Sequence, residues 1–219
     1  MNRTRPRSAL ARQVTGVLNR RVLGPMLAYL QNARRDQFEA TGVPPRQIVL
    51  IGDRLTEAGN WDEWFPGRPV LNRGNGGDHT AEVLARLDSA VHDPLGVLLL
   101  IGTNDISAAV APGETLANLR AILREIERLA PDAPVVVQSV LPRSRSYARE
   151  VRELNRGYQE VVAEAAKRVT YLDLWPALGA DDGSLRKELT PDQVHLNGQG
   201  YREWVTLIRP IIDEWSRSR

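Results

Sequence analysis

The chain has 219 residues, 42% of them hydrophobic, and a formal net charge of +2 at pH 7. This length and hydrophobic content are enough for one substantial core, and no apolar run is long enough to cross a membrane. The absence of cysteine excludes disulfides and thiolate chemistry, and three histidines are too few for a histidine-rich metal site. We therefore expect neither a metal nor a cofactor.

Residues 1–45 are predicted to form a basic helical extension. Residues 1–47 hold nine arginines against two acidic residues. Hydrophobic residues recur at helical spacing on either side of Gly24 and Pro25, which predicts two amphipathic helices. These residues are Leu10, Val14, Leu18, Val22, Met26, Leu27 and Leu30. We expect the helices to pack on the main domain, or to join two copies of the chain as a homodimer.

The same segment bears on location and partners. Arginines interrupt every apolar stretch near its start, so the pattern does not indicate a secretory signal, and we expect a cytoplasmic protein. A basic run more often marks solvent exposure than a nucleic-acid or membrane surface. We expect no nucleic acid as a partner, only a small-molecule substrate.

From residue 46 to residue 219 the chain alternates apolar runs with helical patterns, and we expect one domain. Continuous apolar or β-branched stretches predict strands at 47–51, 69–72, 96–101, 134–140 and 169–174. Helical spacing predicts helices at 80–91, 114–129, 147–168 and 200–215. This order predicts an α/β fold with a five-stranded parallel sheet between two helical layers. Its ligand site should lie beyond the carboxyl ends of the strands.

Polar residues follow the first three predicted strands. Asp53 and Arg54 come after the first strand, Asn75 and Gly77 after the second, and Asn104 after the third. Each turn alone is ordinary cap and turn chemistry. Because the three turns leave the same edge of a parallel sheet, together they predict a site there.

Four blocks of this sequence resemble the SGNH hydrolase family, also called GDSL esterases and lipases, over roughly residues 46–215. The blocks are 52–57, 72–80, 102–105 and the pair Asp192 and His195. The resemblance implies the flavodoxin-like three-layer fold of that family. It also implies that His195 is a general base oriented by Asp192, and that Gly77 and Asn104 help to hold an oxyanion during attack by a serine.

Arg54 stands where the family has its nucleophilic serine. A guanidinium stays protonated and has no lone pair with which to attack a carbonyl. Two neighbours also depart from the family pattern, because Asn75 replaces a residue that is usually aliphatic and His79 replaces a small hydroxyl residue. The departures at residues 75 and 79 suggest that the site changed at several positions together with residue 54.

One hypothesis is a site converted to other chemistry. Arg54, Gly77 and Asn104 would hold an anionic or carbonyl-containing molecule, while His195 with Asp192 moves a proton. Isomerisation, elimination, cyclisation and water-mediated hydrolysis all fit these parts. Further candidates for substrate contact are Asp53, Asn75, His79 and Trp64.

The alternatives are a catalytically dead binding module and an inactivated variant of a carboxylic ester hydrolase. In the binding module, Arg54 pairs with Asp53, Glu57 or Asp192 and fills its own pocket. A guanidinium bound through two bonds to Asp192, with no cavity beside His195, would favour this alternative. An open cavity with a free guanidinium edge favours the converted site.

Overall fold

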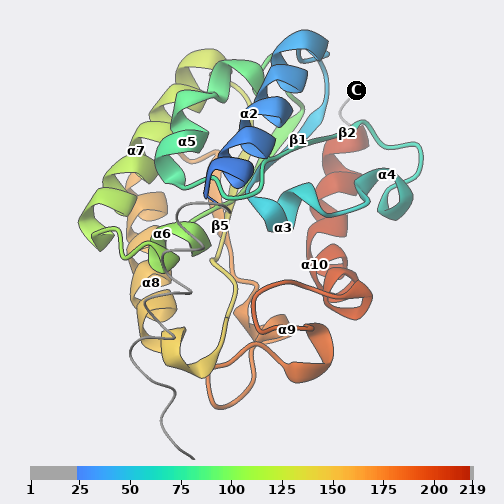
Figure 1. Ribbon diagram of the computed structural model, residues 1–219. Helices are drawn as coiled ribbons and strands as arrows, with labels where there is room; N and C mark the ends of the chain where they lie inside the picture. The colour runs from blue at the N-terminus through green and yellow to red at the C-terminus, as the bar shows by residue number, and fades with distance from the viewer. Residues whose placement is uncertain (1–23, 218–219) are drawn as a thin grey trace, which may run out of the picture.

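Five parallel strands form the centre of the computed structural model, which describes residues 24–217 and the side chains of residues 28–217 (Figure 1). The strands are β1 (Ile48–Gly52), β2 (Val70–Gly74), β3 (Gly96–Leu100), β4 (Val135–Gln138) and β5 (Val169–Leu172). Their order in the sheet is β2-β1-β3-β4-β5, with every pair parallel. The predicted five-stranded parallel sheet is confirmed.

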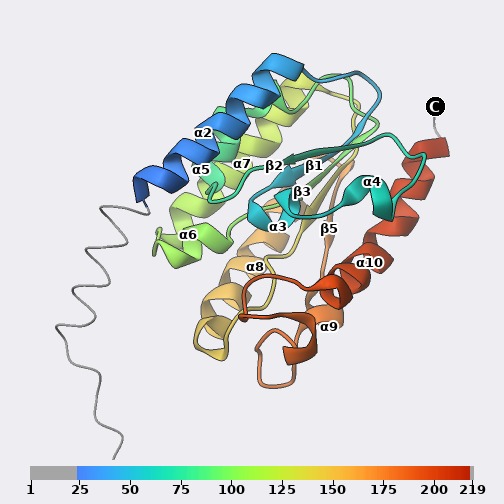
Figure 2. The same ribbon diagram turned by 45° about the vertical axis from the view of Figure 1, so that its right-hand side comes forward.

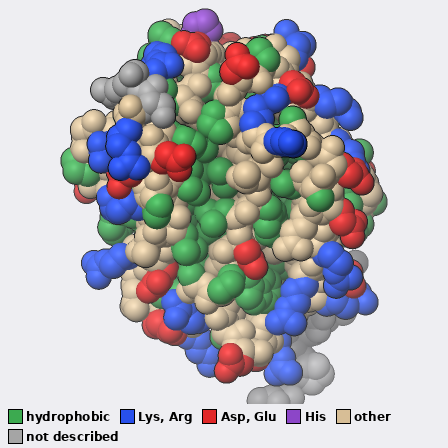
Figure 3. All heavy atoms as spheres, turned by 180° about the vertical axis from the view of Figure 1, so that it is seen from behind, with side chains coloured by type: hydrophobic (Ala, Val, Ile, Leu, Met, Phe, Trp, Pro, Cys, Tyr) green, Lys and Arg blue, Asp and Glu red, His purple; other side chains and the backbone are tan. Residues whose placement is uncertain are grey.

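The composition of the strands follows their position in the sheet. All five residues of β1 and of β3 are buried, and Leu50 of β1 lies beside Leu98 of β3. Central strands covered on both faces need such continuous apolar runs. In contrast, β5 pairs only with β4, and its residues are exposed or half-buried. Figure 3 shows a band of hydrophobic side chains down the face opposite the one in Figure 1.

Helices cover both faces of the sheet (Figure 2). They are α2 (Gly24–Thr41), α3 (Arg54–Glu57), α4 (Trp61–Trp64), α5 (Thr80–Ala85), α6 (Thr103–Ser107), α7 (Pro112–Leu129), α8 (Ala148–Glu164), α9 (Trp175–Leu178) and α10 (Gly198–Arg217). The core on one face includes residues of α5, α7 and α8, and the core on the other includes residues of α4, α9 and α10. This arrangement confirms the predicted three-layer fold. Within the described part of the chain, every helix is too short or too polar to cross a membrane.

The helix predicted at 80–91 is shorter than expected. It ends at Ala85, and a 3-10 turn over Leu87–Ser89 follows. The break falls at Arg86, whose buried side chain bonds the ends of two strands. Four helices of four or five residues, α3, α4, α6 and α9, were not predicted, because so short a segment shows no helical period.

The described part of the N-terminal extension is α2, which packs against the sheet domain. Its buried Phe38 lies against the guanidinium groups of Arg34, Arg73 and Arg86, at 5.1, 4.6 and 5.6 Å from the ring centre. Such contacts are favourable because the ring face carries partial negative charge. The first predicted helix lies outside the described residues, and the division at residue 45 stays a prediction.

A buried ion pair joins the carboxyl ends of β1 and β2. Nε of Arg86 donates to Oδ2 of Asp78 at 2.6 Å, and both side chains are at most 5% exposed. Nη2 of Arg86 also donates to the carbonyl oxygens of Gly52, at 3.1 Å, and Arg73, at 2.9 Å. The guanidinium of Arg86 therefore holds the carboxyl ends of β1 and β2 together.

Replacement of Arg86 with methionine should lower the free energy of unfolding by about 3 kcal/mol, because it leaves Asp78 charged and buried with less compensation. Urea unfolding measures this change. The matched control is Arg128→Met, which removes a guanidinium that bonds Glu125 on the surface and should cost much less, because exposed ion pairs contribute little to stability. Equal losses in the two variants would contradict the role given to Arg86.

Asp53 is a buried carboxyl at the end of β1. Its Oδ1 accepts a hydrogen bond from the amide of Leu55 at 2.9 Å, and so begins α3. Burial, together with the nearby charges of Asp78 and Asp105, raises the pKa of Asp53 from 3.8 to about 7. The bond from Leu55 and the charge of His195 oppose this rise.

This pKa predicts a fall in stability as the pH rises. Between pH 3.8 and about 7 the folded protein keeps a proton on Asp53 that the unfolded chain releases, so unfolding becomes easier across that interval. Asp53→Asn keeps the cap and should flatten that part of the stability curve, measured by urea unfolding at several pH values. The exposed Asp88→Asn is the control, and a curve that both variants leave unchanged would rule out the raised pKa.

Candidate functional site

Five of the residues predicted for the site line one cavity at the carboxyl edge of the sheet. The cavity has a volume of about 750 Å³, and its wall includes Arg54, Asn75, Gly77, Asn104 and His195. These residues come from α3, the loop after β2, α6 and the segment before α10. The convergence expected from a parallel sheet is therefore present in the structure.

His195 and Asp192 form a hydrogen-bonded pair. Nδ1 of His195 lies 2.7 Å from Oδ2 of Asp192, whose Oδ1 accepts the amides of Val194 at 3.0 Å and His195 at 2.8 Å. The hydroxyl of Thr190 accepts the amide of Gln193, at 2.9 Å, where the backbone is left-handed with φ of 66°. Within the described chain, Nε2 of His195 has no hydrogen-bond partner, so it is free to accept a proton.

The charge of Asp192 is stabilised by the same contacts. Partial burial alone would raise its pKa, but the hydrogen bonds from the His195 ring and from the amides of His195 and Val194 lower it to about 2. Asp192 is therefore ionised at neutral pH. An ionised carboxylate on Nδ1 directs the lone pair of a neutral imidazole to Nε2.

Arg54 pairs with a neighbour on its own helix. Its Nη1 donates to Oε2 of Glu57 at 3.2 Å, and its side chain is 55% exposed. Of the three partners considered from the sequence, Asp53, Glu57 and Asp192, only Glu57 bonds the guanidinium in the described chain. One nitrogen of Arg54 is thus engaged, and the cavity beside it is open.

Gly77 and Asn104 lie in the cavity wall with different hydrogen bonding. The backbone of Gly77 is left-handed, with φ of 85°, and its amide has no partner in the described chain. Nδ2 of Asn104 donates to the carbonyl oxygen of Asp78 at 2.8 Å. Asn75 also lines the cavity, and its Nδ2 donates to Oδ1 of Asp78 at 2.9 Å. Asp78 therefore orients two amide side chains of the site.

Three predicted contact residues do not line the cavity. Asp53 is buried at the start of α3. His79 begins α5, where its Nδ1 lies 3.2 Å from Oε2 of Glu82. Trp64 ends α4 and packs against the core on the α10 side, with its carbonyl oxygen accepting Nη2 of Arg209 at 3.1 Å.

Residues that were not predicted as site residues complete the wall. Glu57 lies between Arg54 and the amide of Gly76, which donates to its Oε2 at 2.9 Å. The helix α2 contributes Ala28, Leu30, Gln31, Ala33, Arg34 and Gln37. The position of α2 depends on contacts between Phe38 and arginines distant in sequence, which no local pattern reveals.

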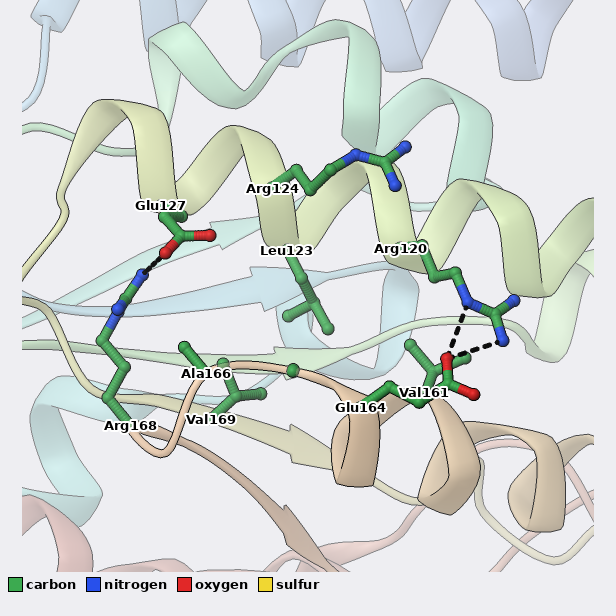
Figure 4. Close-up of a pocket in the computed structure, with 10 residues that line it drawn as sticks. Arg120, Leu123, Arg124, Glu127, Val161, Glu164, Ala166, Arg168 and Val169 are labelled. Atoms are coloured by element: carbon green, nitrogen blue, oxygen red, sulfur yellow. Dashed lines mark hydrogen bonds and ion pairs between the residues drawn. The ribbon is translucent and has the colours of Figure 1, made fainter.

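A second, smaller cavity of about 280 Å³ lies between α7 and α8 (Figure 4). Ion pairs between the two sides, Arg120 with Glu164 at 3.1 Å and Arg168 with Glu127 at 2.9 Å, flank an apolar floor. It contains none of the residues predicted for the site. Across residues 24–217, no three histidine, aspartate or glutamate side chains are grouped so that they could hold a metal ion.

The sequence matches known proteins over most of its length. A model of the GDSL-like lipase/acylhydrolase family matches residues 29–203. Platelet-activating factor acetylhydrolase IB subunit alpha1 of Rattus norvegicus is 33% identical over 165 residues, which cover 71% of this chain and 70% of that protein. The alpha2 subunit of Homo sapiens is 26% identical over 175 residues and 75% of each chain.

Solved structures agree with these matches. A protein of Streptococcus pneumonia, named for platelet activating factor, has a TM-score of 0.81 and 26% identity, covering 94% of this chain and all of its own. A GDSL-like lipase from Bacteroides thetaiotaomicron has a TM-score of 0.69 at 22% identity over 83% and 97% of the two chains, a likeness in fold. From the family match and the identity to the alpha1 subunit, we conclude that this chain belongs to the GDSL-like lipase/acylhydrolase family, the SGNH hydrolases.

Proposed function

We propose that the cavity binds a small anionic or carbonyl-containing molecule and that His195, oriented by Asp192, transfers a proton without an acyl-enzyme intermediate. One observation carries this proposal. The half-exposed guanidinium of Arg54 and the free Nε2 of His195 belong to the wall of the same open cavity. A cation beside a base is the arrangement needed to hold an anion while a proton moves.

Arg54 would act as an anion clamp. Its guanidinium carries five N–H donors in a planar fork, and the contact with Glu57 engages one nitrogen. The unbonded amide of Gly77 and the side chain of Asn104 add neutral donors in the same wall. A carboxylate, an enolate or a phosphate would be stabilised there, as would the negative charge that develops when a carbonyl is attacked.

The pair of His195 and Asp192 would act as the general base. A neutral imidazole can take a proton from an acidic carbon or from a water molecule. The first step leads to isomerisation, elimination or cyclisation, and the second to hydrolysis by water. Because the relatives include proteins named acetylhydrolases, an acyl carbonyl is the electrophile that we favour for the hydrolytic reaction.

The absence of an acyl-enzyme follows from the residue in the Gly-Asp-x-Leu-Thr block. Arg54 occupies the position that the family resemblance gives to serine, and its guanidinium is not a nucleophile. Water activated by His195 would replace the serine hydroxyl. It would add to the carbonyl carbon as its proton passes to His195, and the tetrahedral intermediate would then expel the alcohol, which takes that proton back.

The second candidate is a binding module without catalysis, which the Arg54–Glu57 ion pair favours. In that case the carboxylate of Glu57 neutralises the guanidinium of Arg54, and His195 has no bound substrate from which to take a proton. The open cavity and the absence of an Arg54–Asp192 bond in the described chain support the converted site more strongly. The cytoplasmic location and the homodimer through the N-terminal helices stay predictions.

Arg54→Ser should create an ester hydrolase. The native protein should be nearly inactive on a short activated acyl ester, and the serine variant should exceed it by about 100-fold, because general-base catalysis contributes at least that much. Arg54→Ala controls for the loss of bulk and charge. Fast turnover by the native protein through an acyl-enzyme trapped on another hydroxyl would contradict our interpretation of Arg54.

Small anions should stabilise the native protein against heat. A ligand at 100 times its Kd adds about 2.7 kcal/mol to the free energy of unfolding. In a thermal-shift screen, small carboxylates or phosphates should therefore raise the Tm of the native protein but not that of Arg54→Ala. Arg128→Ala, which removes an arginine of similar exposure outside the site, is the matched control. If no anion raises the Tm, or if Arg54→Ala responds equally, the binding role of Arg54 fails.

A further inference from the structure

A second guanidinium reaches the candidate site from α2. Arg34 lines the same cavity as Arg54, and its Nε donates to the carbonyl oxygen of Gly74 at 2.7 Å. Its guanidinium also lies 5.1 Å from the ring centre of Phe38. These contacts fix the plane of the group. Within the described chain, neither terminal nitrogen of Arg34 has a hydrogen-bond partner.

One carboxylate spans the two guanidinium groups. Oε1 of Glu57 lies 3.5 Å from Nε of Arg34, and Oε2 lies 3.2 Å from Nη1 of Arg54. Glu57 therefore holds the two guanidinium groups within the span of one carboxylate and contacts one nitrogen of each. Two cations against one carboxylate leave a local excess of positive charge.

Gln31, one turn before Arg34 on α2, adds a neutral donor. Its carboxamide lies on the backbone of Gly77, so closely that a methyl group there would overlap the carboxamide nitrogen. In the described chain the Gln31 side chain has no hydrogen-bond partner, and neither does the amide of Gly77. Two free N–H groups from different elements are thus adjacent in the cavity wall.

The wall presents several hydrogen-bond donors that have no partner in the described chain. Its free donors are terminal N–H groups of Arg34 and Arg54, the carboxamide of Gln31 and the amide of Gly77. They come from three elements, so they approach the cavity from different directions. A carboxylate offers two coplanar oxygens, whereas a phosphate monoester offers three oxygens in a tetrahedral array and about two negative charges.

We infer that Gln31 and Arg34 are specificity-determining residues of this cavity and that its ligand carries a phosphate group. The inference rests on the proposed function, because it places the ligand in the same cavity beside Arg54. In this arrangement Arg54 of α3 holds the anion together with Gln31 and Arg34 of α2. The reacting part of the molecule then faces His195.

Calorimetric titration of the full-length protein with inorganic phosphate and with acetate tests the inference, at a pH where phosphate is mostly a dianion. Phosphate should bind more tightly than acetate. Gln31→Ala and Arg34→Gln should each weaken phosphate binding by about tenfold, the effect of one lost hydrogen bond to a charged group. Asn32→Ala, on the exposed face of the same helix, should leave binding unchanged. If Arg34→Gln loosens α2, Gln31→Ala still tests the inference.

Two further results are distinguishable. If acetate binds as tightly as phosphate, and the α2 variants leave both unchanged while Arg54→Ala abolishes binding, the inference fails and the proposed function stands. If neither anion binds the native protein, both fail. Two further probes distinguish a soluble ligand from a lipid. Binding of glycerol 3-phosphate that depends on Arg34 supports a phosphate group on a soluble molecule. Binding of phosphatidic acid vesicles that depends on Arg34 supports a phosphate group on a lipid.

Discussion

The buried pair of Asp78 and Arg86 is the interaction on which the site depends. The guanidinium of Arg86 bonds the carbonyl ends of β1 and β2, and it lies near Phe38 of α2. The carboxylate and carbonyl of Asp78 accept the side-chain amides of Asn75 and Asn104. This ion pair therefore contacts the sheet edge, two polar residues of the cavity and α2, whose Arg35 also pairs with Asp78 at 2.9 Å. Removal of one member of such a pair is costly because the other stays charged in a poorly solvated place.

Acidic side chains near the cavity differ from its arginines in burial. Asp53, Asp78 and Asp105 are buried, and each accepts hydrogen bonds from the start of a helix or from an arginine. Arg34 and Arg54 lie in the cavity wall, where Glu57 contacts both. Of the charged groups in this wall, two arginines therefore stand against one carboxylate.

Much of the scaffold could be predicted from local patterns, but the environment of Arg54 could not. Apolar runs such as 96–101 indicate buried strands, and the parallel order places Gly77, Asn104 and His195 at one edge. The partner of Arg54 was one of three acids considered, and only side-chain geometry selects Glu57. The role of α2 was not predictable, since the helix is held by residues far along the chain, through cation–π contacts of Phe38 and an ion pair between Arg35 and Asp78.

The contact between α2 and Gly77 also constrains how this protein can change over time. Gly77 has a left-handed backbone, and Gln31 fills the space that a side chain would need. A larger residue at position 77 would strain this backbone and would require the flexible Gln31 side chain to move or to be shorter. Across descendants of this chain, a side chain at residue 77 is therefore expected to appear together with a change at residue 31, so that the two positions vary as a pair.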